Sequence, residues 1–363
     1  MGVDEKIKEL EERIANTPYN KSTQKAIGLY KAQLAKLKEK QFQSSGGSTG
    51  EGYDVKKTGD GTVSLLGFPS VGKSTLLNKL TDAESEVAEY AFTTLKVIPG
   101  MLEYEHAQIQ ILDVPGIVSG AASGKGRGSE VLAVLRTSDL ILIVIDVQKP
   151  EQYKSLLKEI RETGIRINQR KPDVKIKKTA KDGIKINKTV NLPDLDDETI
   201  ISILKAFRIN NADVLIRSKI DADDFIDCIE ANKVYLPAVT VLNKVDLVSE
   251  EEANRVAEQV NADFMMSADK DDDKIEELKK VIFEKLDLIR IYMKEPGKDA
   301  DLEEPLIIHR NASVRDVCRK LHKNFEEQFK FARIWGESAK FPGQRQSLKH
   351  VLKDEDIVEL HIK

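Results

Sequence analysis

Residues 67–74 read Gly67-Phe68-Pro69-Ser70-Val71-Gly72-Lys73-Ser74, a match to the phosphate-binding loop pattern G-x-x-x-x-G-K-[ST]. In such loops the glycines let backbone N–H groups curl around the phosphates, the lysine bridges the β and γ oxygens, and the serine hydroxyl holds Mg²⁺. The apolar run Val63–Leu66 predicts a strand before the loop, and Ser74–Leu80 predicts a helix after it. The N-terminus of that helix adds its dipole and free N–H groups to the anion site. The loop therefore predicts a nucleoside triphosphate site in an α/β fold.

Two further motifs follow in the order expected of a guanine nucleotide site. The first, Asp113-Val114-Pro115-Gly116, ends an apolar strand, so Asp113 is expected to hold Mg²⁺ through a water and Gly116 to offer its N–H to the γ-phosphate. The second, Asn243-Lys244-Val245-Asp246, follows another apolar strand. The carboxylate of Asp246 can accept hydrogens from guanine N1 and the 2-amino group, a pair that adenine does not offer. The sequence therefore predicts GTP rather than ATP.

The remaining candidate residues complete the Mg²⁺ shell and the base pocket. A switch threonine is expected near Tyr90, and we assign this role to Thr94 rather than Thr93, although adjacent threonines are also what β structure favours. Ser267 and Ala268 end a further strand, where their backbone N–H groups can reach guanine O6. The sequence thus predicts Lys73, Thr94 and Gly116 as catalytic residues and Ser74, Thr94 and Asp113 as metal ligands. The predicted nucleotide contacts are Gly67, Phe68, Pro69, Ser70, Val71, Gly72, Lys73, Ser74, Thr75, Asp113, Val114, Pro115, Gly116, Ile117, Asn243, Lys244, Val245, Asp246, Ser267 and Ala268.

Residue 117 bears on the rate of hydrolysis. Many switch GTPases place a glutamine after the glycine of D-x-x-G to orient the attacking water, but Ile117 cannot hold water. Hydrolysis then depends on Mg²⁺, Lys73, backbone donors and a further group or partner. Some GTPases use K⁺ held by an asparagine of the phosphate loop; Ser70 occupies that position here, so K⁺ stays an open second cofactor. In the glycine-rich stretch 119–128, Lys125 and Arg127 are either transition-state stabilisers or solvated charges.

Composition limits the class of protein. The chain has 363 residues, which fits two or three globular domains, and 57 Lys and Arg against 61 Asp and Glu give a net charge of −4. This charge rules out a uniformly basic nucleic-acid coat but not a local basic face, and we expect no DNA partner. Cys228 and Cys318 lie far apart, so we expect buried thiols of a cytoplasmic protein rather than a disulfide framework or a zinc site. The N-terminus has no hydrophobic signal region, and the longest apolar run, Leu140–Ile145, is too short to cross a bilayer. We therefore expect no membrane partner.

Residues 1–50 predict a helical hairpin and a linker. Apolar stripes over 7–14 and 27–37 predict two helices, and Asn16-Thr17-Pro18 breaks the chain between them. Residues 43–50 are rich in Ser and Gly, so the hairpin is expected to move relative to the part of the chain that follows. Its lysines are either contacts for RNA phosphates or a solvated face. They are Lys21, Lys25, Lys31, Lys36, Lys38 and Lys40.

The order of the nucleotide motifs and the residues that compose them resemble those of the Obg-related GTPases. Within that group they resemble the DRG family, the developmentally regulated GTP-binding proteins. The resemblance covers essentially the whole chain. It implies a P-loop GTPase (G) domain over residues 61–290, hydrolysis of GTP to GDP and phosphate, and a small domain inserted between the two halves of the G domain. It also implies a regulatory protein partner of the DRG type.

Chain length independently indicates an insertion. About 130 positions separate Asp113 from Asn243, whereas a minimal GTPase needs two helix–strand units of ~30 residues each there. Residues 166–236 supply the extra length, with strands expected over 174–177, 184–187 and 214–216 and helices near 198–206 and 223–230, which predicts an α+β subdomain. Its lysines fit ribosomal RNA contacts and edge-strand protection equally well. They are Lys175, Lys177, Lys178, Lys181, Lys185 and Lys188.

After Arg290 the G-domain pattern ends, and residues 296–299 predict a linker. Residues 291–363 alternate short strands with a helix over 314–325, which resembles the β-grasp TGS domain shared with threonyl-tRNA synthetase and the stringent-response synthetases. Basic residues are expected to line this helix beside Trp335, either as an RNA-binding face or with Trp335 as a core residue. They are Arg315, Arg319, Lys320, His322 and Lys323.

Two functions fit these motifs. In the first, the chain is a GTP-hydrolysing switch that engages the ribosome in translation. In the second, it is a nucleotide-gated RNA or ribosome binding protein whose slow turnover is incidental, an alternative that Ile117 leaves open. A metabolic enzyme is disfavoured because no second substrate site, metal cluster or nucleophile constellation accompanies the nucleotide motifs.

Overall fold

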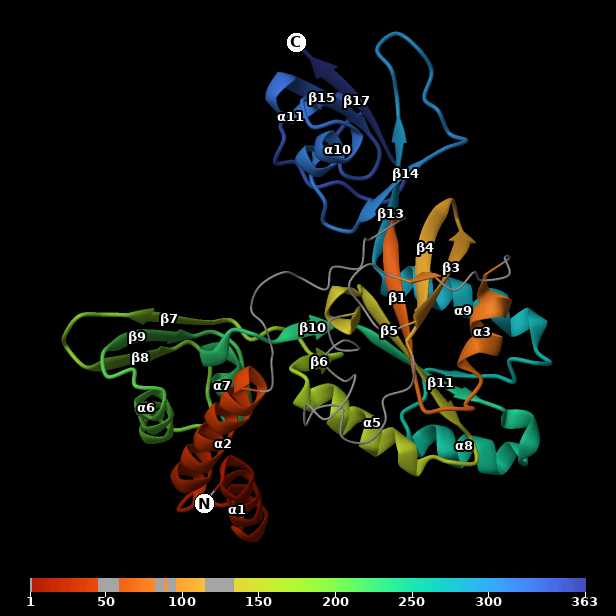
Figure 1. Ribbon diagram of the computed structural model, residues 1–363. Coiled ribbons are helices and arrows are strands. Elements are labelled where there is room, and N and C mark those ends of the chain that lie inside the picture. The colour runs from red at the N-terminus through yellow and green to blue at the C-terminus, as the bar shows by residue number, and fades with distance from the viewer. Residues whose placement is uncertain (1, 45–58, 82–87, 90–95, 115–133) are drawn as a thin grey trace. The chain divides into compact units, whose positions relative to one another are not determined.

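The computed structural model describes residues 2–44, 59–81, 88–89, 96–114 and 134–363 (Figure 1). These residues form two compact units. Unit 1 consists of residues 2–44 and 159–235, and unit 2 consists of the other described residues. Within the described ranges, no helix has the length and apolar character needed to cross a membrane.

The larger sheet of unit 2 carries the phosphate loop. In spatial order, its described strands are β12 (Phe264–Met265), β11 (Ala238–Asn243), β5 (Leu140–Asp146), β1 (Gly61–Leu66), β4 (Ala107–Asp113), β3 (Lys96–Tyr104) and β2 (Ala88–Glu89). The strands from β12 to β4 are parallel, whereas β3 and β2 are antiparallel to their neighbours. Every residue of β1 and β5 is buried, as expected for parallel strands covered on both faces. The α/β fold class predicted from the sequence is thereby confirmed.

Helices α3 (Lys73–Leu80), α5 (Glu151–Glu162), α8 (Glu250–Gln259) and α9 (Asp272–Lys285) follow strands of this sheet along the chain, and residues 134–137 before β5 are also helical. A short 3₁₀ helix, η2 (Val245–Leu247), follows β11. Leu77 of α3 and Leu278 of α9 lie in one buried cluster with Val63 of β1. The apolar face of α3 thus fixes the helix, and with it the end of the phosphate loop, against the sheet.

A second sheet lies in the C-terminal part of unit 2. In spatial order, it consists of β14 (Leu306–His309), β13 (Leu288–Met293), β17 (Asp356–Ile362), β15 (Phe329–Trp335) and β16 (Gln344–Gln346). Its first strand, β13, begins at Leu288, whereas the sequence pattern placed the end of the G domain after Arg290. The helix expected over 314–325 is two helices, α10 (Val314–Leu321) and α11 (Phe325–Gln328). The break between them follows His322, which has an extended backbone and ends α10.

Trp335 does not lie beside the basic helix, contrary to the sequence-based expectation. Ala332 and Ile334 of β15 are fully buried in a core with Val317 and Cys318 of α10. Because successive strand residues point to opposite faces, Trp335 belongs to the face turned away from α10. The cations of α10 are also engaged, since Arg315 and Arg319 both contact Glu326.

Unit 1 joins the N-terminal hairpin to the inserted subdomain. The hairpin is α1 (Val3–Asn16) and α2 (Gln24–Ser44), and the subdomain is a sheet of β7 (Val174–Lys178), β9 (Ala212–Ile216) and β8 (Ile184–Lys188) with α6 (Asp197–Ala206) and α7 (Ala222–Glu230). Two short strands, β6 (Ile165–Ile167) and β10 (Val234–Leu236), pair with each other. Ala32 of α2 is fully buried in the core formed by α6, α7 and the sheet of β7, β9 and β8. The hairpin therefore packs on the insertion rather than moving independently of it.

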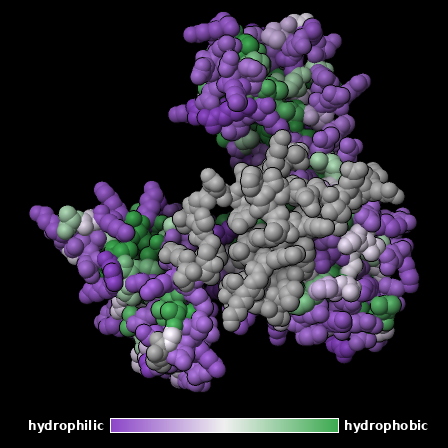
Figure 2. All heavy atoms as spheres, viewed as in Figure 1, coloured by the Kyte–Doolittle hydropathy of each residue, from purple (hydrophilic) through white to green (hydrophobic). Residues whose placement is uncertain are grey.

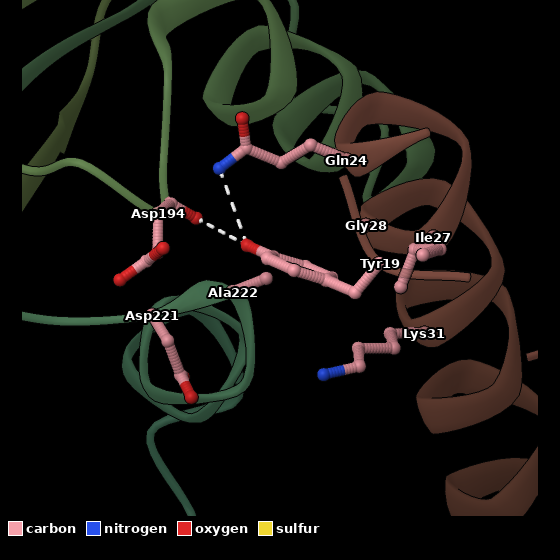
Figure 3. Close-up of a pocket in the computed structure, with 8 residues that line it drawn as sticks. All are labelled: Tyr19, Gln24, Ile27, Gly28, Lys31, Asp194, Asp221 and Ala222. Carbon is pink, nitrogen blue, oxygen red and sulfur yellow. Dashed lines mark hydrogen bonds between the residues drawn. The ribbon is translucent and has the colours of Figure 1, made fainter. Parts of the chain in front are cut away.

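The lysines of the hairpin are mostly engaged within unit 1. Lys25 pairs with Glu198 at 3.0 Å, and Lys31 pairs with Asp223 at 2.9 Å. Lys36 donates a hydrogen bond to the carbonyl oxygen of Ala206 at 2.8 Å. Beside them, Tyr19 Oη donates to the carbonyl oxygen of Asp194 at 2.9 Å, across a small pocket between the hairpin and the insertion (Figure 3). These lysines are therefore docking contacts and not an outward RNA-binding face.

A buried ion pair holds β6 to α7. Arg166 Nε and Nη2 donate to the two carboxylate oxygens of Asp227 at 2.6 and 2.8 Å, and the two side chains are 8 % and 6 % exposed. Half-buried Cys228 lies next to this pair, and burial raises the pKa of its thiol to about 11. Cys318, in contrast, is fully buried, so only the second cysteine matches the expectation of a buried thiol.

Removal of Arg166 should strongly destabilise unit 1. We expect Arg166→Ala to lower the free energy of unfolding by about 3–5 kcal/mol, because the Asp227 carboxylate would remain buried without its partner. Urea unfolding followed by circular dichroism measures this loss. Arg217→Ala is the matched control, since Arg217 pairs with Asp173 at 3.1 Å on the surface and should contribute under about 1 kcal/mol. Equal losses in the two variants would contradict the prediction.

Candidate nucleotide site

The phosphate loop has a backbone shape that depends on two of its glycines. Gly72 has φ +99°, and a Cβ there would lie 2.3 Å from Asn243 Nδ2. A Cβ on Gly67 would lie 2.5 Å from the carbonyl oxygen of Val144. Ser70 also adopts a positive φ of 66°. The loop can therefore turn tightly over the ends of β1 and β5 only with glycine at positions 67 and 72.

Lys73 lies inside the curve of this loop. Its Nζ donates to the carbonyl oxygens of Gly67 and Phe68 at 3.0 and 3.1 Å, and the residue is 8 % exposed. Burial lowers the pKa of Lys73, and the negative charge of Asp113 acts in the opposite direction. The ammonium is thus held where phosphate oxygens would replace the two carbonyl groups as acceptors.

Ser74 and Asp113 are brought together from α3 and β4. Ser74 Oγ donates to Asp113 Oδ2 at 2.9 Å. Burial raises the pKa of Asp113, and this effect is opposed by the Ser74 hydrogen bond and by the charge of Lys73. Two hard oxygen atoms side by side fit the oxygen shell that Mg²⁺ prefers. Among the described residues, no group of three His, Cys, Asp or Glu is placed to hold a metal ion.

Asn243 and Lys244 tie the end of β11 to the phosphate loop. Asn243 Nδ2 donates to the carbonyl oxygen of Val71 at 2.9 Å, and Lys244 Nζ donates to that of Ser70 at 2.7 Å. Lys244 also pairs with Asp146, the last residue of β5, at 2.8 Å. These contacts fix the start of the segment 243–246 against the phosphate loop.

Asp246 is a fixed and ionised acceptor. Its Oδ1 accepts a hydrogen bond from Ser267 Oγ, and its Oδ2 accepts one from Lys270 Nζ, both at 2.6 Å. These bonds, that of Lys270 first, lower the pKa of Asp246. The backbone N–H of Asp246 donates in turn to Ser267 Oγ at 3.0 Å. The carboxylate is therefore oriented by the loop that follows β12.

The backbone donors expected for guanine O6 have protein acceptors in this structure. Ser267 N–H donates to Asp271 Oδ2 at 2.8 Å, and Ala268 N–H donates to Asn243 Oδ1 at 2.9 Å. Both residues nevertheless adjoin Asp246, because Ser267 bonds to it through its hydroxyl. Contact of these two N–H groups with guanine O6 therefore stays a prediction from the sequence, and the structure adds their protein acceptors, Asp271 and Asn243.

The other predicted contacts divide into described and undescribed residues. Phe68 packs against the core of the large sheet, Val114 N–H donates to the carbonyl oxygen of Leu65 at 3.4 Å, and Val245 N–H donates to that of Met266 at 3.4 Å. Pro69 lies in the loop and Thr75 lies in the first turn of α3. Outside the described residues lie Thr93, Thr94, Pro115, Gly116, Ile117, Lys125 and Arg127.

Three residues of the site were not singled out from the sequence: Asp146, Lys270 and Asp271. Asp146 is 5 % exposed and ends a buried strand, as Asp113 does. Its place at the end of an apolar run could therefore have identified it from the sequence. Lys270 and Asp271 follow Ser267 in a polar loop, where no local pattern distinguishes them from solvated charges.

Comparison with known proteins agrees with this geometry. A family model described as a 50S ribosome-binding GTPase matches residues 62–178, and a model for its C-terminal region matches 181–288. Human developmentally-regulated GTP-binding protein 2 is 44% identical over 99% of both chains. The chain belongs to the DRG family of GTP-binding proteins. An uncharacterized GTP-binding protein of Methanocaldococcus jannaschii is 50% identical over 100% of this chain and 94% of its own.

Two further findings concern this DRG-family chain. Its residues 289–362 match the TGS domain model, so the C-terminal sheet with α10 and α11 is a TGS domain. The protein named ribosome-interacting GTPase 1 of Saccharomyces cerevisiae is 44% identical over 98% of both chains. The resemblance inferred from the nucleotide motifs is thereby confirmed, and with it the GTPase and TGS folds.

Proposed function

We propose that this chain is a Mg²⁺-dependent GTPase that acts in the cytoplasm as a switch engaging the ribosome during translation. The observation that carries the proposal is the placement of Asp246. Its carboxylate is oriented by Ser267, and Asn243 and Lys244, from the same motif, bond directly to the phosphate loop. One rigid unit thus offers acceptors to a guanine edge and donors to phosphates.

Each group of site residues has its own role in GTP hydrolysis. The loop N–H groups and Lys73 stabilise negative charge on the phosphates, and Gly67 and Gly72 allow the close approach that this requires. Ser74 and Asp113 would hold Mg²⁺, which supplies charge stabilisation to the β and γ oxygens when bound. Thr94 and Gly116 keep the roles proposed from the motifs. With Ile117 after the switch glycine, a ribosome, a K⁺ ion or a regulatory protein has to supply the missing stabilisation.

A basic sheet face in unit 1 supports the ribosome as partner. Lys175, Lys177 and Lys185 are exposed on β7 and β8. In the strand registers, Asp213 of the middle strand β9 lies opposite Lys177 on one side and Lys185 on the other. Lys188 is already paired with Asp197 at 2.6 Å. The three lysines therefore leave a positive excess that suits phosphate backbones. The names of the family model and of the yeast relative point to the same partner.

Steady-state GTP hydrolysis tests the proposal. We expect an intrinsic rate on the order of 10⁻⁴–10⁻² s⁻¹, as in GTPases whose catalytic groups are incomplete, and at least a tenfold increase with purified ribosomes. The rate should vanish without Mg²⁺. Parallel assays in K⁺ and Na⁺ separate a cation requirement from ribosome stimulation.

Two outcomes would overturn this proposal. If ribosomes leave the rate unchanged while GTP still promotes ribosome binding, the chain is a nucleotide-gated binding protein with incidental turnover. If ribosomes neither bind nor stimulate hydrolysis under any nucleotide, the partner is wrong.

A further inference from the structure

The TGS sheet has one face packed on α10 and an opposite face whose residues lie outside that core. We call the second, on strands β15, β16 and β17, the outer TGS face. It carries Phe331, Arg333, Trp335, Arg345, Glu359 and His361. Pairs in register establish this, because Arg333 lies opposite both Arg345 and Glu359, and Phe331 lies opposite His361. On the side drawn in Figure 2, hydrophilic residues cover most of the visible TGS domain.

A bulge in β15 separates Phe329 from Phe331, the first residue of this strand on the outer TGS face. The register shifts between Phe329 and Phe331, so Phe329 packs in the core while Phe331 lies opposite His361. The extra residue, Lys330, is exposed. Bulges of this kind redirect side chains at functional edges of sheets. The result is a run of ring and guanidinium planes on the face away from α10.

Three of these planar groups form a row across the strands. The rings of His361 and Phe331 stack with centroids 4.2 Å apart and planes 17° apart. The guanidinium Cζ of Arg345 lies 4.4 Å from the centre of the Phe331 ring. Because β15 lies between β17 and β16, Phe331 is the middle member and Arg345 is the end of the row. Arg345 is therefore the outermost group of the row, and it is exposed.

The charge on this face is positive and incompletely neutralised. The side chain of Glu359 is 3 % exposed, and its carboxylate already pairs with Lys294 at 2.7 Å and with His361 at 2.6 Å. Arg333 reaches the same carboxylate only at 3.8 Å and is 41 % exposed. Arg345 is exposed, and no carboxylate within the described parts of the chain pairs with it. The donors of Arg333 and Arg345 are thus available to an anion.

We propose that the outer TGS face binds single-stranded RNA, with a base stacked on the Arg345 guanidinium and neighbouring phosphates held by Arg345 and Arg333. This inference deepens the proposed function, on which it rests for RNA as the partner. Exposed bases stack readily on arginine planes, and phosphate contacts supply the affinity. A duplex would not fit, because its bases are already stacked within the helix. An acidic protein would satisfy the charges but would leave the flat surface of Arg345 unused.

Fluorescence anisotropy with a labelled 12-nucleotide oligouridylate and the full-length chain tests the proposal. We expect Arg345→Ala to weaken binding about tenfold, in line with the loss of one stacked base. Arg345→Lys keeps the charge and loses the plane, so its affinity should fall between those of the wild type and Arg345→Ala. Arg333→Ala should reduce the slope of log K against log salt by about 0.7 for the phosphate contact removed.

Arg319→Ala is the matched control, because Arg319 lies on α10 and is bound to Glu326 at 2.6 Å. It should change RNA affinity less than twofold. The proposal is overturned if Arg345→Ala binds like the wild type, if the control loses as much, or if duplex RNA or oligoglutamate competes as well as the single strand. No guanine nucleotide or ribosome is present in this assay. The RNA-binding result can therefore be interpreted even if the proposed ribosome switch fails its own test. Likewise, a failure to bind RNA in this assay would not decide whether ribosomes stimulate GTP hydrolysis.

Discussion

Asp246→Asn should weaken GTP binding by about 10²–10⁴-fold and convert the site to a preference for xanthosine triphosphate. The wild-type carboxylate offers two acceptors to guanine N1–H and the 2-amino group, and each charged hydrogen bond contributes about 1.5–3 kcal/mol. An amide offers one acceptor and one donor. That pair matches xanthine, which has N1–H and a carbonyl oxygen at position 2. Isothermal titration with GTP, ATP and xanthosine triphosphate measures the change.

The structure indicates that this substitution leaves the fold in place. Asp246 is partly exposed, at 24 % of its side chain, and an amide oxygen can still accept the Ser267 hydroxyl that bonds to it at 2.6 Å. Asp269→Asn is the control, because Asp269 is exposed in the same loop and should alter affinity less than twofold. Wild-type protein that takes up ATP as tightly as GTP would remove the basis for this assignment. So would an Asp246→Asn variant that binds GTP within about threefold of the wild type.

The strand–loop–helix core was predictable because its determinants are local. The apolar run before Gly67 and the helix-forming run after Lys73 are contiguous, and the loop between them requires glycine at fixed positions whatever surrounds it. The inserted strands and helices were equally predictable, since the alternation of the strands and the apolar spacing of the helices can be recognised in short stretches of sequence. The observed elements follow those expectations to within a few residues.

What the sequence did not show depends on contacts between distant segments. Lys31 resembles any solvated lysine until the fold places Asp223 at 2.9 Å from it. Trp335 is ambiguous for a different reason. Ile334 and Trp335 are both apolar neighbours on one strand, so either could face α10, and a one-residue change of register exchanges their faces. Only the packing of Ala332 and Ile334 into the helix-covered core decides it.

Lys73→Met should reduce the affinity for GTP by about 10²–10⁴-fold, because the ammonium is expected to make charge-assisted bonds to the β and γ oxygens. Lys79→Met is the control on the same helix: Lys79 pairs with Asp272 at 2.6 Å on the surface and should leave affinity unchanged. Titration with GTP measures both variants. A Lys73→Met protein with wild-type affinity would contradict the role given to this residue.

A second measurement separates lost binding from lost folding. Burial lowers the pKa of Lys73 in the folded, nucleotide-free protein below its usual 10.5. Between the lowered pKa and 10.5 the unfolded chain binds more protons, so the stability of the wild type should rise with pH in that window. Below the lowered pKa the cost of burying the ammonium is fully present, and Lys73→Met removes it. Thermal unfolding without nucleotide should therefore show the variant at least as stable as the wild type at neutral pH. The stability of the variant should also lack the increase with alkaline pH that Lys73 contributes in the wild type. A variant that unfolds at lower temperature would show instead that the bonds of Lys73 to the Gly67 and Phe68 carbonyl oxygens outweigh the cost of burying its charge.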